Sequence, residues 1–211
     1  LRWFTGPLLP AIDDWAWMLA TMAVLTMVFG NLIALQQHNI KRLLAYSSIS
    51  QVGYMLMAVT AMSPETSGGL LVHLGGYLVT NLVVFVAVIH FYNQTGKEEI
   101  SDFKGLAQTN PYLALVITAG LFSLAGMPLL AGFFTKFILF QSVVSEGYLW
   151  LVIVGVVAST VSLFYYLQVI KQMYLYEPLN PARWRISATG YLVTGALFVA
   201  MVVLGLWGTP L

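Results

Sequence analysis

Lys136 is the residue of this sequence whose type and position most clearly suggest chemistry. It lies inside the apolar run Ala125–Phe140, with about eight residues of helix between it and the outward end of the predicted span at Val144, or roughly 12 Å at the rise of an α-helix. That depth is too great for comfortable snorkelling, and a charge near a bilayer centre costs at least ~2.5–3.5 kcal/mol. Intramembrane charges of this kind usually face a bundle interior or a water-filled cavity, so we predict a proton-transfer role for Lys136.

A predicted helix break lies just before this lysine. Pro128 cannot donate a backbone hydrogen bond and clashes with the preceding turn, while Gly126 and Gly132 add backbone freedom around it. Unwound backbone at membrane depth is tolerated only where it is buried in protein or lines water. A discontinuous helix beside an intramembrane ionisable group is typical of ion pathways in transporters. The alternative is a structural lysine that pairs with a carboxylate or caps carbonyls of the broken helix.

Four other polar residues inside apolar segments are candidates for a proton path. His73 is expected at a depth like that of Lys136, and the ordinary titration range of histidine suits a relay. Ser123, Thr135 and Tyr165 carry hydroxyls that can hold water. The alternative for each of the four is a hydrogen bond that joins packed helices, and the sequence alone does not separate the two roles.

The composition requires a membrane around these residues. Hydrophobic residues make up 59% of the 211, and charged residues only 8%, whereas about 25% is usual for soluble domains. The sequence has no cysteine, which excludes disulfides and thiolate metal sites, and its net charge of +1 gives no basic patch for nucleic acid. It also lacks a glycine-rich phosphate loop and any His/Asp/Glu cluster at metal-ligand spacing, so neither a cofactor nor a metal ion is expected to bind this chain.

The hydropathy pattern predicts an all-α integral membrane protein with one transmembrane domain over residues 1–211. A bilayer core needs about 20 apolar residues of helix, and six segments qualify, the fourth of them long enough to be broken near Pro128. The chain begins at Leu1 without a signal peptide, and we expect it to be a fragment of a longer subunit. The predicted spans are Trp15–Leu35, Leu43–Met62, Gly68–Tyr92, Pro111–Val144, Tyr148–Tyr176 and Ile186–Trp207.

The loop charges predict the orientation of these spans. Three loops at one end contain basic residues, whereas the opposite end has Arg2 together with Glu65 and Glu146. The positive-inside rule places the basic end in the cytoplasm, or in a mitochondrial matrix or plastid stroma, and we expect a bacterial plasma membrane. The basic residues are Lys41, Arg42, Lys97, Lys104, Arg183 and Arg185.

Five stretches of the sequence resemble the proton-translocating subunit family that complex I and Mrp antiporters share. The resemblance extends over essentially the whole chain and is strongest to the subunit N branch of that family. The stretches are Gly30–Leu35, Asn39–Tyr54, Asp102–Leu106, Ser123–Lys136 and Ser162–Tyr174.

The resemblance implies both a topology and a role. The six spans would correspond to helices nine to fourteen of a fourteen-helix subunit, and Lys136 would fall on a lysine of the broken twelfth helix, assigned to the outward proton half-channel. The family's other main titratable groups would precede Leu1, so this chain would hold the outlet of a proton path without its inlet.

The implied function is proton pumping within a complex I-type NAD(P)H:quinone oxidoreductase. This chain would bind no redox cofactor; quinone and NAD(P)H or ferredoxin would react elsewhere in the complex, whose other membrane subunits would be its partners. The alternatives are a subunit of an Mrp-type cation/proton antiporter or of a membrane-bound hydrogenase, and a purely structural membrane anchor.

Overall fold

The computed structural model of the protein describes residues 12–61, 63–178 and 182–206, and every regular element among them other than one isolated bridge is helical. Five of the helices are long and apolar enough to cross a membrane, and two shorter apolar helices follow one another in the chain. In order they are α1 (Ile12–Leu35), α2 (Ile40–Ala61), α3 (Pro64–Thr95), the 3-10 helix η2 (Ile100–Phe103), α4 (Leu106–Thr109), α5 (Pro111–Ala125), α6 (Ala131–Ser145), α7 (Leu149–Leu175) and α8 (Ala188–Leu206).

The six predicted crossings are confirmed, with the fourth divided as expected. Helices α5 and α6 together replace the single segment Pro111–Val144, and the gap between them contains Pro128. The short helices η2 and α4, between the third and fourth crossings, were not predicted. Three predictions lie outside the described residues, namely the position of Arg2 and the exact span ends at Met62 and Trp207.

Local capping signals explain why some helices extend beyond their apolar parts. Helix α3 begins four residues before the predicted Gly68, because Ser63 accepts a hydrogen bond from the Thr66 amide and Pro64 occupies the first turn. Asn110 caps α5 in the same way, by accepting from the Leu113 amide, with Pro111 next in the chain. At α3 the cap thus adds a turn before the apolar part of the helix, whereas α5 begins at the predicted Pro111.

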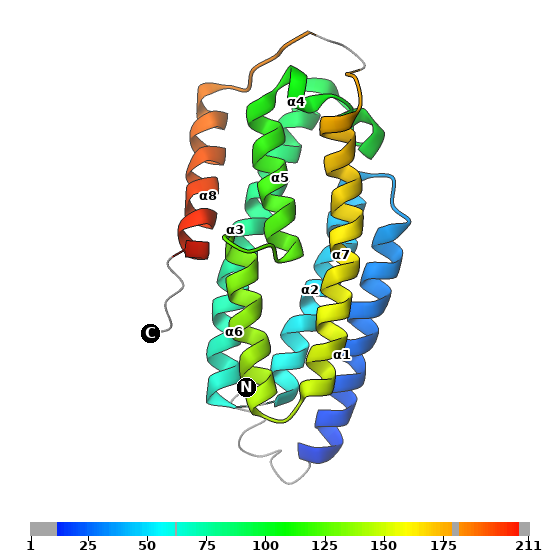
Figure 1. The fold of residues 1–211 in the computed structure, drawn as a ribbon, viewed down its shortest axis with the longest axis vertical. Coiled ribbons are helices and arrows are strands. Elements are labelled where there is room, and N and C mark those ends of the chain that lie inside the picture. The colour runs from blue at the N-terminus through cyan, green and yellow to red at the C-terminus, as the bar shows by residue number, and fades with distance from the viewer. Residues whose placement is uncertain (1–11, 62, 179–181, 207–211) are drawn as a thin grey trace.

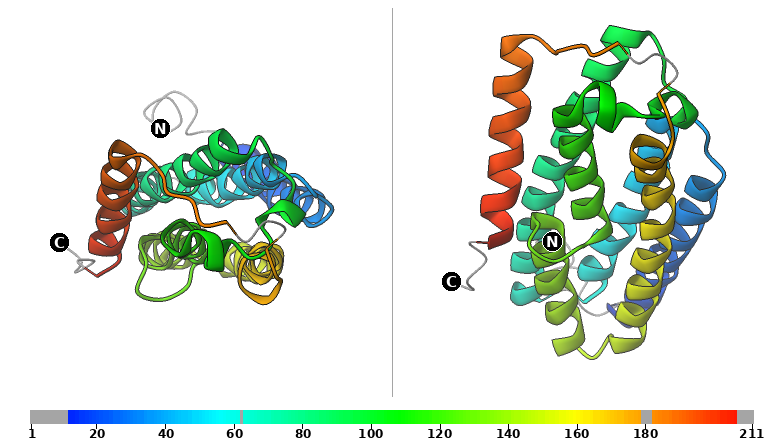
Figure 2. Two further views of the ribbon diagram at one scale, coloured as in Figure 1. Left: turned by 90° about the horizontal axis from the view of Figure 1, so that it is seen from above. Right: turned by 45° about the horizontal axis from the view of Figure 1, so that its top comes forward.

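The helices form two rows that run along the long axis of the molecule (Figure 1). Seen from above, α8, α3, α2 and α1 make one row, and the second row consists of α7 beside the stacked pair α5 and α6 (Figure 2). Helix α3 contacts both α5 and α6, and α7 contacts α1, α2 and both halves of the broken crossing. The break between α5 and α6 thus lies within the second row, partway along the bundle (Figure 1).

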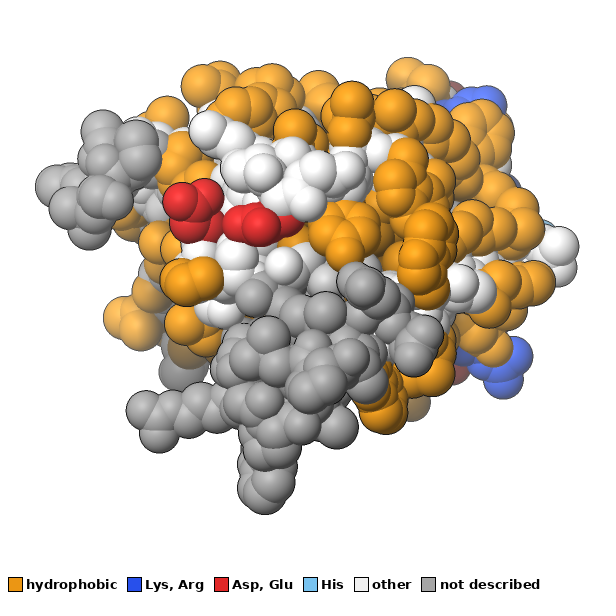
Figure 3. Space-filling model, turned by 90° about the horizontal axis from the view of Figure 1, so that it is seen from below, with side chains coloured by type: hydrophobic (Ala, Val, Ile, Leu, Met, Phe, Trp, Pro, Cys, Tyr) orange, Lys and Arg blue, Asp and Glu red, His pale blue; other side chains and the backbone are white. Residues whose placement is uncertain are grey.

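Two of the basic loops meet at one end of the bundle. Lys41 Nζ lies 2.6 Å from a Glu98 carboxylate oxygen, and the Asn39 side chain donates to the other oxygen at 2.8 Å. The Ile40 amide donates to the Glu98 carbonyl, and the Ile100 amide to the His38 carbonyl. These contacts fasten the loop between α1 and α2 to the loop after α3. The opposite end, viewed in Figure 3, presents acidic side chains beside a broad hydrophobic surface.

This fastening is expected to weaken in acid. The hydrogen bond from Lys41, and then that from Asn39, hold the pKa of Glu98 below the ordinary glutamate value of about 4.3. A lowered folded-state pKa gives stability that is present above the unfolded value and is lost as pH falls through the folded one. Hydrogen-exchange protection of the Ile40 and Ile100 amides should therefore decline as pH falls below about 4.

Glu98→Gln supplies the control for that experiment. Because glutamine has no charge to titrate in this range, the protection factors of the two amides should be lower than in the wild type and independent of pH. Wild-type protection factors that stay constant from neutral pH into acid would contradict the assignment.

Candidate functional site: a buried lysine at a broken helix

The interruption between α5 and α6 has a defined backbone conformation. Helix α5 ends at Gly126, which adopts φ +89° and donates its amide to the carbonyls of Phe122 and Ser123. Glycine suits this left-handed cap because it has no β-carbon. Leu129 also has a positive φ of 74° and is 71% exposed, and α6 then begins after Leu130. The predicted break around Pro128 is therefore present, and it starts at the glycine that precedes the proline.

Side chains from three other helices satisfy the carbonyls at the end of α5. The Leu124 carbonyl accepts from Lys136 Nζ of α6 at 2.7 Å and from Gln51 Nε2 of α2 at 3.2 Å. Ser159 of α7 donates to the Ala125 carbonyl at 2.9 Å. A helix C-terminus carries partial negative charge and unpaired carbonyls, both of which favour a cation. The end of α5 thus forms a ready-made acceptor site for the lysine ammonium.

The first turn of α6 is held by α5 itself. The Gly132 amide donates to Ser123 Oγ at 3.0 Å, and that oxygen lies 3.0 Å from the Thr80 hydroxyl of α3. A β-carbon on Gly132 would overlap the Ser123 carbonyl, so the two half-helices approach more closely than any other residue would permit. Gly132 was predicted at the break, and Ser123 was a candidate for the proton path. Here both hold the two half-helices together, and the hydrogen bonds of Ser123 fit the alternative role of joining packed helices.

Lys136 is buried without an ionic partner among the described residues. It is 5% exposed, and its Nζ lies 3.1 Å from Ser159 Oγ and 5.0 Å from the centre of the Tyr54 ring. The ion pairs that the described part of the chain contains lie in the basic loops and leave this lysine out. Neutral oxygens and an aromatic face thus surround the ammonium, so no ion pair has to break for its proton to leave.

His73 and Thr135 lie on one side of Lys136. His73 is buried, its Nδ1 lies 3.2 Å from Thr135 Oγ1, and its Nε2 has no hydrogen-bond partner among the described residues. A cavity of about 10 Å³, lined by Lys136, His73, Thr135, Thr80 and others, separates these groups and is close to the size that one water molecule needs. The prediction that His73 lies at the depth of Lys136 agrees with this geometry.

Tyr165 lies on the other side, among α1, α2 and α7. Its hydroxyl donates to Asn31 Oδ1 at 3.0 Å, and the Asn31 amide donates to Ser50 Oγ at 2.9 Å. The hydroxyl of Tyr54 is surrounded by Ser50, Ser159 and Asn31, yet it makes no hydrogen bond within the described structure. The sequence-predicted path residues are therefore divided into two groups, with Lys136 between them.

Four polar residues at this site were not singled out from the sequence. They are buried or partly buried; three of them contact Lys136 or a group bonded to it, and Asn31 bonds to Ser50 and Tyr165 nearby. Gln51 and Tyr54 lie in Asn39–Tyr54, one of the stretches that carry the family resemblance, but hydropathy does not show which helix face they occupy. The four residues are Asn31, Gln51, Tyr54 and Ser159.

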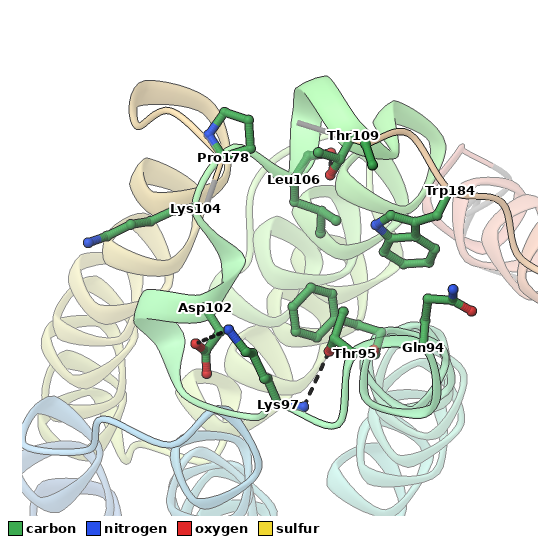
Figure 4. Close-up of a pocket in the computed structure, with 11 residues that line it drawn as sticks. Gln94, Thr95, Lys97, Asp102, Lys104, Leu106, Thr109, Pro178 and Trp184 are labelled. Carbon is green, nitrogen blue, oxygen red and sulfur yellow. Dashed lines mark hydrogen bonds and ion pairs between the residues drawn. The ribbon is translucent and has the colours of Figure 1, made fainter. Parts of the chain in front are cut away.

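Two larger cavities are less suited to proton transfer than the helix break. One of about 370 Å³ lies among the basic loops (Figure 4), where Lys97 is turned toward Asp102 and forms an ion pair with it at 3.6 Å. The other, of about 350 Å³, lies between α6 and α7 and is lined mainly by apolar side chains such as Phe133 and Phe137, with Lys136 at its edge. Neither gathers several unpaired polar groups, whereas the helix break does.

Comparison with known sequences identifies relatives over the full chain. The sequence pattern of the NADH:quinone oxidoreductase/Mrp antiporter transmembrane family matches residues 2–162. NADH-quinone oxidoreductase subunit N of Moorella thermoacetica is 42% identical over 212 aligned residues, which cover 100% of this chain and 44% of that protein. The chain therefore spans less than half the length of the curated relative that it matches.

Solved structures share the arrangement of helices. An archaeal respiratory membrane complex, the membrane-bound sulfane sulfur reductase, contains a chain that is 31% identical, with a TM-score of 0.86 over 94% of this chain and 40% of the other. Respiratory complex I from Thermus thermophilus contains one that is 30% identical, with a TM-score of 0.73 over 90% of this chain and 43% of the other.

Proposed function

Because the chain belongs to the NADH:quinone oxidoreductase/Mrp antiporter family of transmembrane subunits, we propose that it forms the C-terminal half of a proton-translocating subunit of a complex I-type quinone oxidoreductase. The match of the whole chain to 44% of a subunit N protein supports this assignment. The 30% identity to a chain of a respiratory complex I supports it as well.

The observation that carries the proposal is the setting of Lys136. The ammonium is buried where a helix is interrupted, and it donates to the Leu124 carbonyl and Ser159 rather than to a carboxylate. Removing a proton from such a lysine breaks no ion pair, and the neutral amine can still donate to the same oxygens. Lys136 is thus suited to alternate between charged and neutral forms during turnover.

Coupling to quinone reduction would be electrostatic. The chemistry of quinone and of NAD(P)H or ferredoxin would take place in other subunits, and this chain would hold no redox group. A positive charge that arrives on a neighbouring buried group would repel the Lys136 proton, because charges interact strongly where the surroundings are poorly polarisable. The proton would then leave past Thr135 and His73 toward the acidic end of the bundle.

The proposal also implies in which membrane the protein lies and which subunits contact it. Other membrane subunits of a complex would cover part of the apolar surface, and the bacterial plasma membrane would surround the rest. The loops of Lys41 and Arg42, Lys97 and Lys104, and Arg183 and Arg185 would face the cytoplasm under the positive-inside rule.

The test is the activity of the complex that contains the full-length subunit. The complex would be purified through a tag on this subunit and reconstituted in vesicles with quinone and NADH, NADPH or reduced ferredoxin in turn. We expect one of these donors to drive quinone reduction and proton uptake into the vesicles, and a protonophore to abolish the proton gradient. Quinone reduction without proton movement, or a complex without quinone reductase activity, would contradict the proposal.

A cation/proton antiporter or another membrane-bound respiratory complex is the second candidate. The archaeal sulfane sulfur reductase chain, with a TM-score of 0.86 against 0.73 and 0.81 for two complex I chains, supports a respiratory membrane complex of another kind. The same vesicles distinguish the two functions. Proton movement driven by an imposed sodium gradient, with neither quinone nor electron donor present, would favour this second function.

A further inference from the structure

A row of buried polar side chains leads from Lys136 toward the basic loops, away from His73. Ser159 Oγ lies 3.1 Å from Lys136 Nζ, and the Tyr54 hydroxyl lies beside Ser159, Ser50 and Asn31. Because the Tyr54 hydroxyl is buried and makes no hydrogen bond among the described residues, it is free to take part in a new one. The row therefore begins with groups that contact the lysine itself.

The row continues through α1 and α7. Asn31 accepts from the Tyr165 hydroxyl and donates to Ser50 Oγ, so it holds hydroxyls from two helices beside Tyr54. Tyr165 packs edge-on against Tyr166, with 4.6 Å between ring centres, and the Tyr166 hydroxyl is bonded to Ser47 Oγ of α2. All of these side chains are buried, and their polar atoms are directed toward one another.

The direction of the row follows from helix geometry. Tyr165 comes six residues after Ser159 on α7, which is roughly 9 Å closer to the basic end at 1.5 Å per residue. Ser47 precedes Tyr54 on α2 by seven residues, or roughly 10 Å in the same direction. Helix α6, by contrast, runs from Lys136 toward the opposite end of the molecule (Figure 1). The row through Tyr54 and Tyr165 thus extends toward the basic end, whereas His73 and Thr135 stay near the depth of Lys136.

A polar cavity lies beyond Tyr165 at the basic end. Its volume is about 300 Å³, and Gln168, Gln172 and Lys171 of α7 line it together with His38 and Ser101 from the loops. Gln168 and Gln172 follow Tyr165 by three and seven residues, spacings that place side chains on one face of a helix. Gln172 Oε1 is itself buried with no hydrogen-bond partner within the described structure. Gln168 and Gln172 therefore lie on the side of α7 that carries Tyr165, beside the buried Val169, and lead to this cavity.

We propose that this row is a proton-uptake route to Lys136 from the basic face, contained within this chain. The inference rests on the proposed function. It departs from the expectation that the inlet lies on helices outside the chain, because the polar row extends from the lysine toward the basic end within these residues.

The proton balance along the row is simple. Each hydroxyl accepts a proton on an oxygen lone pair and passes its own proton onward, with water completing the row where neighbouring hydroxyls lie beyond hydrogen-bond distance. The neutral Lys136 amine becomes an ammonium, and the hydroxyls return to their starting state. Asn31 is a positioning residue in this scheme, because its amide orients the hydroxyls of Tyr165 and Ser50 without releasing a proton of its own.

Two tyrosine variants test the route in the complex that contains the full-length subunit. Tyr54→Phe and Tyr165→Phe each remove one oxygen and keep the ring that packs in the core. Proton pumping should fall about tenfold in each, a loss below the roughly 100-fold that a fixed proton donor can contribute, since water can substitute for a hydroxyl. Acidifying the basic-loop side of the vesicles should restore part of the rate, and acidifying the other side should not.

Tyr112→Phe is the matched control. The Tyr112 hydroxyl also bonds across helices, to Thr194 Oγ1 and the Tyr191 carbonyl of α8, but it lies outside the row. This variant should pump like the wild type. If Tyr54→Phe and Tyr165→Phe instead lower quinone reduction and pumping equally, without any dependence on the pH of one side, their role is structural and the route is excluded.

A second experiment tests the polar cavity at the basic end through a substitution that leaves the core unchanged. None of the 211 residues is a cysteine, so within this part of the subunit Gln168→Cys introduces one thiol that a bulky, charged reagent can modify from the basic side. Modification should slow pumping. Modification of Leu167→Cys, on the neighbouring exposed position of α7, should not.

The outcomes separate this inference from the proposed function. Wild-type pumping by both tyrosine variants and by the modified Gln168→Cys complex would overturn the uptake route, and it would leave the proposed function intact if Lys136→Met still fails to pump. Wild-type pumping by Lys136→Met would overturn both.

Discussion

Replacing Lys136 with methionine is expected to abolish proton pumping by a complex that still assembles. Methionine fills a similar volume and removes a buried charge, so the packing around the site should be retained. The Leu124 carbonyl keeps its hydrogen bond from Gln51, so the end of α5 remains capped. Pumping should nevertheless fall by roughly 100-fold or more, the lower end of what a positioned proton-transfer group contributes.

The measurement is the rate of vesicle acidification per quinone reduced, with assembly checked by native electrophoresis. Lys104→Met removes the same charge from a loop and should leave the ratio unchanged. An assembled Lys136→Met complex with the wild-type ratio would show that the lysine carries no proton during turnover.

Gly132→Ala is expected to prevent α6 from docking against α5. The added β-carbon would overlap the Ser123 carbonyl, a backbone atom that cannot rotate away. Overpacking costs roughly 1–3 kcal/mol where side chains can adjust, and we expect at least the upper end of that range here. The shift of α6 should also pull Lys136 away from the Leu124 carbonyl, so assembly and pumping should fail together.

The matched control is Gly75→Ala. Gly75 is also a helical glycine, but the space around its β-carbon position is open to at least 4 Å. Alanine there should be neutral or slightly stabilising, because it raises helix propensity. The amount of subunit in purified membranes and the thermal midpoint of the complex measure both variants. Normal assembly of Gly132→Ala would show that the half-helices do not approach as closely as described.

Much of the fold follows from hydropathy and from a few backbone signals. Six apolar segments predicted six crossings, and Pro128 predicted the break in the fourth. The start of α3 was placed four residues late, because apolar content sets the predicted boundary whereas Ser63 and Pro64 set the real one. The helices η2 and α4 were missed because each is only about one turn long and is fixed by contacts between loops.

The site was predictable only in part. The depth of Lys136 in an apolar run was enough to predict its burial, since a lone charge is rare there. A bond to carbonyls of the broken helix was expected as the alternative role, but neither the particular carbonyl, Leu124, nor Ser159, which lies 23 residues farther along the chain, was predictable. The separation of Tyr165 from His73, on opposite sides of the lysine, likewise depends on how α3 and α7 pack around the break.

The central claim is that Lys136 releases a proton rather than merely capping the end of α5. The bond from Lys136 to the Leu124 carbonyl would also serve a static cap, so a decisive variant must retain the charge and the donor but lose the ability to deprotonate. Arginine has these properties, because its guanidinium donates hydrogen bonds and stays protonated in proteins.

The most direct measurement is therefore the number of protons pumped per quinone reduced by the Lys136→Arg complex, after its assembly has been verified. We expect an assembled complex in which the contribution of this subunit to the ratio is lost. An assembled Lys136→Arg complex that pumps with the wild-type ratio would contradict the claim and identify Lys136 as a structural cap.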